Sequence, residues 1–223
     1  MIGNQVISEI MKLEGTEYLF CYPANTLIES AAIAGIKPIM SRTERTTVNM
    51  ADGYSRVSNG HKIGVVVTQS GPGVENAFSG VAHAYAESTP ILVIPGGTAR
   101  SKSGQPPDFD AISAYRSVTK WASLVNQVDR IPEMMRRAYT FLRSGRLGPV
   151  MLQVPADVSQ ESIGETALNY RAVKGFKSAG DQADVSAAMQ ALLAAKNPII
   201  YAGQGVLWAE ASTELVEFAE LLD

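Results

Sequence analysis

The sequence predicts an α/β protein, with a doubly wound, mostly parallel sheet covered by helices on both faces and followed by a truncated second α/β unit. Helical and strand patterns alternate along the chain with short breaks, as in folds whose parallel strands are joined by helices. Residues 63–68 form an almost continuous β-branched run, which is typical of a strand covered on both faces. With 223 residues the chain is long enough to bury a substantial core.

Local signals place the predicted elements of the first part of the chain. The helix at 5–14 has apolar residues at helical spacing and ends at Gly15, and the helix at 27–34 ends at Gly35. Pro23 ends the strand at 18–22. The other predicted strands are 37–40, 63–68, 90–95 and 150–154, and the other predicted helices are 44–56, 74–86 and 132–142.

The pattern changes in two later regions. Residues 98–116 are dominated by small and polar residues, which predicts a long loop that is functional or disordered. After a predicted linker at 161–180, the sequence predicts a helix at 185–195, a strand at 199–202 and a helix at 210–222. Because one helix–strand–helix cannot cover its own sheet, we expect this second unit to be incomplete.

Composition argues against several classes of function. The chain has 19 basic and 22 acidic residues, a net charge of −3 and no basic block, so we expect no nucleic-acid partner. The longest apolar run, residues 91–94, is too short to cross a membrane, and the N-terminus lacks the pattern of a signal peptide. The single cysteine, Cys21, allows neither an internal disulfide nor a thiolate metal cluster. We therefore expect a cytoplasmic protein.

Two glycine turns partly match a dinucleotide-binding loop. Residues 71–73 and 203–205 each follow a predicted strand and begin a helix. Both lack the third glycine of G-x-G-x-x-G, where Asn76 and Trp208 stand. A nucleotide-binding redox domain that uses NAD or FAD is therefore an alternative function.

Glu44 stands between a predicted strand and a predicted helix, at the edge of the sheet where α/β folds bind ligands. Ser41-x-x-Glu44 is also the pattern of a capping box, in which Glu at the third helical position bonds back to the N-cap amide. A buried carboxyl could instead share a proton with a ligand nitrogen, because desolvation favours its protonated form. Local sequence leaves both interpretations open and favours the structural one.

Several segments carry a family resemblance. They are residues 20–25 (FCYPAN), 42–56 (with RTE and MADGYSR), 68–77 (TQSGPGVENA) and 146–157 (ending in VPAD). Together they resemble the pyrimidine-binding domain of the thiamine diphosphate enzymes, close to the acetolactate synthase branch. Residues from about 183 onward resemble the start of that family's central domain. The resemblance implies a pyrimidine-binding domain at 1–160, a linker at 161–180 and an incomplete central domain at 181–223.

The resemblance implies a catalytic role for Glu44. In this family the matching Glu hydrogen-bonds N1′ of the cofactor aminopyrimidine and shifts the ring towards its imino form, which removes the thiazolium C2 proton. The ylid then attacks a 2-keto acid, and carbon dioxide leaves. We therefore expect a thiamine diphosphate-dependent decarboxylase or carboligase.

The resemblance also implies the remaining candidate site residues. Those expected to bind the cofactor, besides Glu44, are Pro23, Ala24, Gly71, Pro72, Gly73 and Asn76. Phe109 matches a residue near the substrate in the synthases. Asn25 and Gln69 are candidates to hydrogen-bond a substrate carboxylate or carbonyl.

The chain departs from the acetolactate synthases at three places. Ala24 and Asn25 stand where those enzymes usually have two glycines, Thr43 stands where His is usual, and Asp110 stands where Gln is usual. These departures leave open whether the reaction is acetolactate synthesis, another carboligation or a decarboxylation.

The family's motif for diphosphate and Mg²⁺, a Gly-Asp-Gly with a downstream Asn pair, does not occur in these 223 residues. In the family it belongs to a third domain, usually supplied by a partner subunit. The resemblance therefore implies Mg²⁺ bound outside this chain and a homodimer or homotetramer, and it leaves FAD open for the full-length protein. We expect this chain alone to bind the cofactor weakly and to be inactive. A non-catalytic subunit of such an enzyme is the second alternative.

Overall fold

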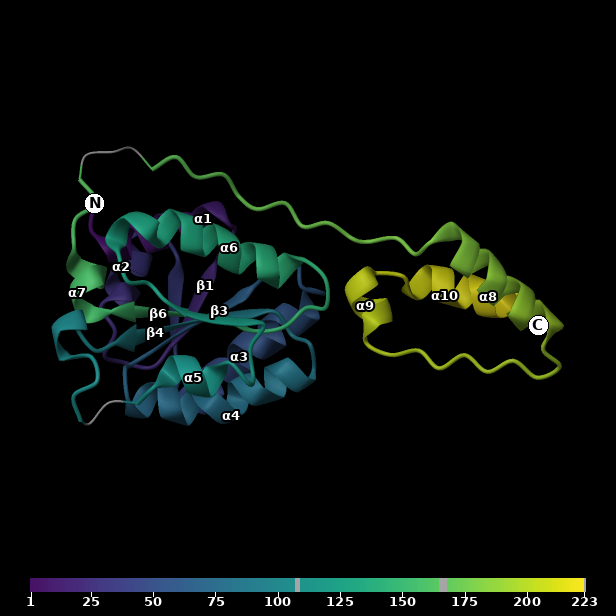
Figure 1. Cartoon of the computed structure of the whole chain (residues 1–223), viewed down its shortest axis with the longest axis horizontal. Coiled ribbons are helices and arrows are strands. Elements are labelled where there is room, and N and C mark those ends of the chain that lie inside the picture. The colour runs from purple at the N-terminus through teal and green to yellow at the C-terminus, as the bar shows by residue number, and fades with distance from the viewer. Residues whose placement is uncertain (107–108, 165–167, 223) are drawn as a thin grey trace. The chain divides into compact units, whose positions relative to one another are not determined.

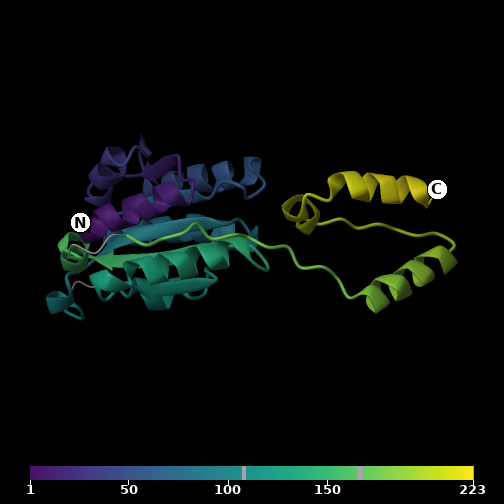
Figure 2. The same cartoon turned by 90° about the horizontal axis from the view of Figure 1, so that it is seen from above.

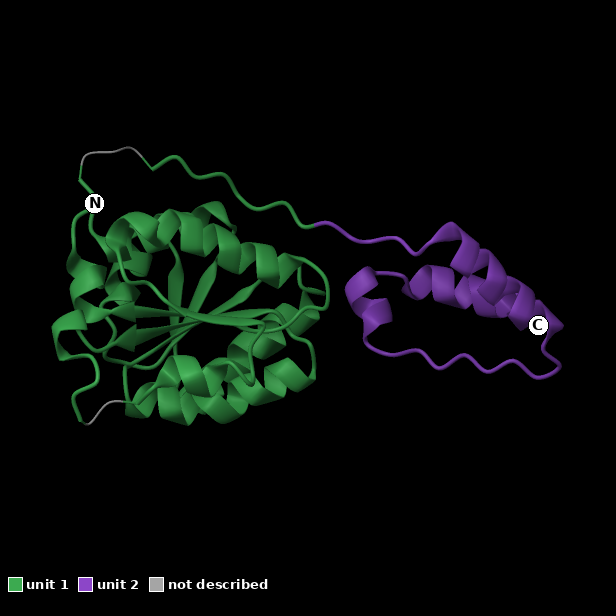
Figure 3. Ribbon diagram, in the orientation of Figure 1, with its two compact units in different colours: residues 1–175 green, residues 176–223 purple. Residues whose placement is uncertain are grey.

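The computed structural model describes residues 1–106, 109–164 and 168–222. The chain divides into two compact units, Met1–Gly175 and Phe176–Asp223, which Figure 3 colours separately. Residues 107–108 of the predicted loop and 165–167 of the predicted linker lie outside the described residues. The predicted domain boundaries at 160 and 180 stay predictions.

The described part of the first unit is built on one six-stranded sheet, in which each strand is parallel to its neighbours (Figures 1 and 2). The strand order is β2-β1-β3-β4-β6-β5. The strands are β1 (Tyr18–Cys21), β2 (Lys37–Met40), β3 (Gly64–Thr68), β4 (Ile91–Gly97), β5 (Trp121–Leu124) and β6 (Val150–Pro155). Helices cover both faces, which confirms the predicted doubly wound α/β fold.

Two apolar layers flank the sheet. In β3, Val65 and Val67 pack in one layer and Val66 packs in the other. Because neighbouring residues of a strand point to opposite faces, the continuous apolar run is buried on both sides. The helices are α1 (Gly3–Leu13), α2 (Leu27–Ile33) and α6 (Ile131–Arg143) on one face, and α3 (Glu44–Val57), α4 (Pro72–Ala86) and α5 (Ala111–Tyr115) on the other (Figure 1).

The structure contains short elements that the sequence patterns do not predict. They are β5, α5, α7 (Ala156–Gln160) and the 3₁₀ helices η1 (Arg100–Lys102) and η2 (Val128–Arg130). An element this short shows too little of a helical or alternating period to be recognised in the sequence. The predicted loop at 98–116 therefore holds η1 and α5.

The strand order reverses between β1 and β3. β1 lies between β2 and β3 in the sheet. The chain therefore runs from β1 to β2 on one side of it and then crosses to β3 on the other side. Such a reversal separates the loops that follow the two strands, and α/β sheets bind ligands at this point. The loops after β1 and β3 therefore border the expected binding site.

Two glycines let α3 lie close to its neighbours. A Cβ on Gly80 of α4 would lie 2.8 Å from Cβ of Val48 in α3, and a Cβ on Gly64 of β3 would lie 2.2 Å from the carbonyl oxygen of Ala51. Both separations are shorter than packed carbon and oxygen atoms tolerate. A larger residue at either position would displace α3, and with it the side chains at its start.

Glu14, which follows α1, holds the end of the first unit in place. Its buried carboxylate accepts hydrogen bonds from the Arg143 guanidinium, from the Tyr170 hydroxyl and from the backbone N–H of Val173 (3.0 Å). Arg143 also donates to the carbonyl oxygen of Val173 at 2.6 Å. Burial and the hydrogen bond to Glu14 raise the pKa of Tyr170, which keeps its hydroxyl a neutral donor. A buried charge of this kind depends on each of its partners.

The described residues of the second unit contain α8 (Gln182–Ala194), α9 (Gly205–Ala209) and α10 (Ser212–Leu221). The prediction of a strand at 199–202 is wrong, because these residues do not form a strand. Ile199 and Tyr201 are 88% and 98% exposed. A strand requires a neighbouring strand for its backbone hydrogen bonds, and the described residues of this unit provide none.

Gly80→Ala should lower the free energy of unfolding by about 1–3 kcal/mol, because the added methyl group overpacks the contact with Val48. Urea denaturation followed by circular dichroism measures the change. Gly53→Ala in α3 is the matched control, because a Cβ there meets nothing within 4 Å. Ala is the better helix former, so this control should gain up to about 1 kcal/mol. Unchanged stability of Gly80→Ala would contradict the role of close packing.

Glu14→Gln should destabilise the protein by about 3–5 kcal/mol, because it leaves the partly buried Arg143 guanidinium without its carboxylate. Chemical denaturation measures the loss. Glu133→Gln is the control, since it breaks an exposed pair with Arg130 (3.1 Å) and should cost less than about 1 kcal/mol. Equal losses in the two variants would show that the buried contacts of Glu14 add nothing beyond a surface ion pair.

Candidate active site

Glu44 is the first residue of α3, follows the short turn after the carboxyl end of β2 at Met40, and is 6% exposed. The prediction of a capping box formed by Ser41 and Glu44 is wrong. The N-cap is Thr43, whose backbone is extended and whose Oγ1 accepts a hydrogen bond from the backbone N–H of Thr46 at 3.2 Å. Ser41 instead donates from Oγ to the carbonyl oxygen of Thr43 at 2.8 Å. The Glu44 carboxylate therefore has no part in capping and points elsewhere.

The carboxylate of Glu44 lies beside the start of α4. Its Oε2 accepts a long hydrogen bond (3.4 Å) from Nδ2 of Asn76, and a Cβ on Gly73 would lie 3.5 Å from its Oε1. Among the described residues, Oε1 accepts no hydrogen bond. The N-terminus of α4 carries partial positive charge, which stabilises a carboxylate in this position. Glu44, Gly73 and Asn76 are thus brought together as the resemblance implies.

The loop after β1 is tied to the end of β3 through Asn25. Its Nδ2 donates to the carbonyl oxygen of Thr68 at 2.9 Å, and its Oδ1 accepts from the backbone N–H of Leu27 at 2.9 Å. A Cβ on Gly96 would lie 3.6 Å from the same Nδ2, so β4 also passes close by. The amide of Asn25 therefore lies between the carboxyl ends of β1 and β3, and backbone groups hold it in one orientation.

The exposed loop residues lie at the same edge of the sheet. Pro23, Ala24 and Gln69 are exposed, and they follow β1 and β3. Ala24 has φ of +79°, in the left-handed region that an alanine side chain disfavours. Gly71, with φ of +61°, makes the turn into α4. The backbone of the loop after β1 is therefore strained at Ala24.

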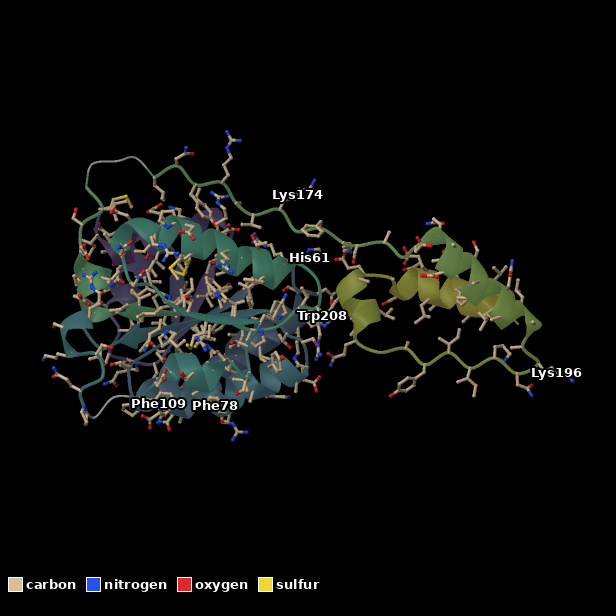
Figure 4. All side chains as sticks on the ribbon, in the orientation of Figure 1. His61, Phe78, Phe109, Lys174, Lys196 and Trp208 are labelled. Carbon is tan, nitrogen blue, oxygen red and sulfur yellow. The ribbon has the colours of Figure 1, made fainter. Side chains whose placement is uncertain are left out.

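A separate cleft of about 1140 Å³ lies at the carboxyl ends of β4, β5 and β6. Gly71, Pro72 and Phe109 line it, together with Gly97, Thr98, Arg100, Ser103, Leu124, Gln153 and Pro155 among others. Phe109 and Phe78 both lie in the layer of α4 and α5 (Figure 4). Glu44, Asn25 and Gln69 do not line this cleft. The candidate residues thus fall into two neighbouring groups, joined by the turn at Gly71 and Pro72.

Arg100 is a charged residue of the cleft that sequence reasoning did not select. Its Nε donates to Asp157 at 2.6 Å, and its Nη2 donates to Glu161 at 2.7 Å. These hydrogen bonds raise the pKa of Arg100. Partial burial acts to raise the pKa of Asp157, but the hydrogen bonds from Arg100 outweigh it and hold that pKa below its ordinary range. The partners lie far apart in sequence, so no local pattern could reveal the cluster.

The fold and this site define a cofactor-binding α/β domain, with a buried carboxylate and a glycine-containing helix N-terminus at the carboxyl edge of a parallel sheet. Residues 1–117 match the family model "Thiamine pyrophosphate enzyme, N-terminal TPP binding domain", and residues 185–223 match "Thiamine pyrophosphate enzyme, central domain". The chain therefore belongs to the thiamine pyrophosphate (thiamine diphosphate) enzyme family, which confirms the resemblance.

Curated relatives match almost the whole chain. It is 32% identical to the acetolactate synthase large subunit of Haemophilus influenzae and 34% identical to that of Buchnera aphidicola subsp. Schizaphis graminum, and each alignment covers 99% of this chain and 40% of the relative. It is 29% identical to the probable acetolactate synthase large subunit of Methanocaldococcus jannaschii, over 100% of this chain and 39% of the relative. The chain thus spans about 40% of the length of these relatives.

The residues around Glu44 fit an aminopyrimidine ring. Oε1 of Glu44 accepts no hydrogen bond from the described residues, and Gly73 lets the backbone of α4 lie close to the carboxylate, because a Cβ there would stand only 2.9 Å from Cβ of Gln69. Within residues 1–106, 109–164 and 168–222, no group of three His, Cys, Asp or Glu side chains could hold a metal ion.

Ala24→Gly should stabilise the protein by up to about 1 kcal/mol, because glycine adopts a positive φ without a steric cost. Thermal unfolding of the two proteins measures the gain. Ala32→Gly, on the exposed side of α2, is the control and should lose about 1 kcal/mol through lower helix propensity. A loss of stability in Ala24→Gly would contradict the strain assigned to this loop.

Proposed function

We propose that this chain forms the aminopyrimidine-binding part of a thiamine diphosphate-dependent enzyme that acts on a 2-keto acid as a carboligase or decarboxylase. The observation that carries the proposal is the buried carboxylate of Glu44 at the carboxyl edge of the sheet, with Oε1 open to a ligand. The relatives named acetolactate synthase support the substrate class.

Thiamine diphosphate, when bound, supplies a nucleophilic carbon at its thiazolium ring that a 2-keto acid can be attached to. Glu44 holds a nitrogen of the aminopyrimidine through a carboxyl hydrogen bond and shifts a proton along it. Asn76 orients the carboxylate through its bond to Oε2. The packing of α3 against α4 buries the carboxylate, and burial strengthens this contact.

The other candidate residues have supporting roles in the proposal. Gly71, Pro72 and Gly73 form the surface against which the pyrimidine packs, since little side-chain volume stands there. Pro23 and Ala24 border the reacting face from the loop after β1. Phe109 contributes an apolar wall near the substrate from the cleft.

Asn25 and Gln69 are the proposed polar contacts of the substrate. Nδ2 of Asn25 has one further N–H beyond the bond to Thr68, and its orientation is held by two backbone hydrogen bonds. Gln69 is exposed and free to turn towards a carboxylate. The fixed amide of Asn25 would favour one substrate shape, whereas the exposed amide of Gln69 would adapt to several.

The remaining parts of the proposed enzyme lie outside this chain. We place Mg²⁺ and the diphosphate on another domain, in a homodimer or homotetramer whose sites are shared between subunits. Among the described residues we find no helix with the length and apolar character needed to span a membrane. We infer a cytoplasmic location for the enzyme.

A nucleotide-binding redox domain is not favoured. The family models that match are those of thiamine pyrophosphate enzymes. The turn at 203–205 does not follow a strand in the described residues, so it lacks the strand–turn–helix context that a dinucleotide loop requires.

Glu44→Gln should reduce turnover of 2-keto acids by about 10²–10⁴-fold in the intact protein, because the amide cannot pass a proton to and from the cofactor ring. A panel of 2-keto acids with thiamine diphosphate and Mg²⁺ measures the loss. Glu29→Gln, which changes an exposed Glu in the first turn of α2, is the matched control and should keep full activity. Full activity in Glu44→Gln would remove Glu44 from the mechanism. A wild-type protein that turns over no member of the panel would instead support a non-catalytic subunit.

A further inference from the structure

A buried hydroxyl beside Glu44 has no partner. Thr68, the last residue of β3, is 0% exposed, and its Oγ1 has no hydrogen-bond partner among the described residues. Its backbone carbonyl, in contrast, accepts the hydrogen bond from Asn25. Burying a hydroxyl without a partner destabilises a protein and is uncommon. The buried hydroxyl of Thr68 therefore lowers the stability of the protein in the absence of a partner.

Thr68 faces the same layer as Glu44. Side chains alternate along β3, so Thr68 points to the face on which Gly64 meets Ala51 of α3 and Val66 packs. A Cβ on Gly73 would lie 3.7 Å from Cβ of Thr68 and 3.5 Å from Oε1 of Glu44. The hydroxyl-bearing carbon of Thr68 and the carboxylate oxygen of Glu44 thus lie near the same point beside Gly73.

The two groups are chemically complementary. Oε1 of Glu44 is an acceptor without a donor among the described residues, and the Thr68 hydroxyl is a donor without an acceptor. A hydroxyl that donates to a carboxylate makes a strong, charge-assisted hydrogen bond, and one water can bridge a gap that is too long for direct contact.

We propose that Thr68 is a positioning residue for Glu44: its hydroxyl donates a hydrogen bond towards Oε1, directly or through one water. This bond holds the carboxylate in the orientation in which it meets the aminopyrimidine. The inference rests on the proposed function of Glu44 and goes beyond it, because it assigns a role to a side chain that does not touch the cofactor.

Thr89 provides a matched comparison. It is also 0% exposed with an unpartnered Oγ1, but it precedes β4 at the opposite, amino edge of the sheet. Valine replaces the hydroxyl of threonine by a methyl group of similar size. Thr68→Val and Thr89→Val therefore remove the same kind of buried group, and we expect the two to have similar effects on the melting temperature of the cofactor-free protein.

The experiment compares the two variants in the intact protein. In Thr68→Val, isothermal titration should show thiamine diphosphate binding, with Mg²⁺ present, weakened about fivefold to tenfold, the equivalent of one hydrogen bond. The acid limb of the pH profile of kcat/KM should move to higher pH by about 0.5–1 pH unit, because the ionised carboxylate has lost a donor. Thr68→Ser keeps the hydroxyl and should restore both properties, and Thr89→Val should leave both unchanged.

The outcomes separate this inference from the proposed function. Suppose that Thr68→Val binds thiamine diphosphate as tightly as the wild type and keeps its pH profile, while Glu44→Gln is inactive. This result would overturn the positioning role of Thr68 and leave the proposed function of Glu44 standing. The same changes in Thr89→Val would also overturn it, since they would then reflect a general effect of losing a buried hydroxyl. Full activity in Glu44→Gln would overturn the proposed function itself.

Discussion

The close packing of α3 against α4 and β3 determines where Glu44 lies. Glycines at 64 and 80 remove the side chains that would separate these elements, so the first turn of α3 comes to rest beside the first turn of α4. A glutamate at the first position of a helix is ordinarily solvated, and here the neighbouring helix covers it. The N-termini of both helices compensate part of the cost of burying the charge. Position, burial and electrostatic support of the carboxylate thus follow from one packing contact.

Features that do not favour stability gather at this edge of the sheet. Ala24 has a left-handed backbone, Thr68 has an unpartnered hydroxyl, and Glu44 is a buried carboxylate with one long hydrogen bond. Such departures are typical of binding sites, where geometry serves a ligand rather than the free protein. Away from this edge, Glu14 is fully satisfied by its partners and holds the end of the first unit. Local strain thus occurs at the candidate site, although an unpartnered buried hydroxyl is also found at the opposite edge of the sheet, at Thr89.

The sequence predicted the long elements well and the short or isolated ones poorly. Five strands and five helices of the first unit were predicted close to their observed bounds, because each carries a clear apolar period or a Gly or Pro signal at its end. β5 and α5 were missed because each is shorter than the period that would reveal it. The strand at 199–202 was predicted from apolar character alone, which does not supply the neighbouring strand it needs. The capping box failed because Thr43 competes for the same role at closer range.

By itself, the sequence determined the α/β class, the family and the candidate residues, because periodicity and short motifs are local properties of the chain. Only the tertiary structure decided which of these residues meet. It brought Glu44 to Gly73 and Asn76 and tied Asn25 to the end of β3. It also placed Phe109 in a separate cleft. It revealed two further groups that no sequence motif marks, the Arg100 cluster and the buried Thr68 hydroxyl. The physical reason is that burial and hydrogen bonding depend on packing between segments that are distant in the sequence.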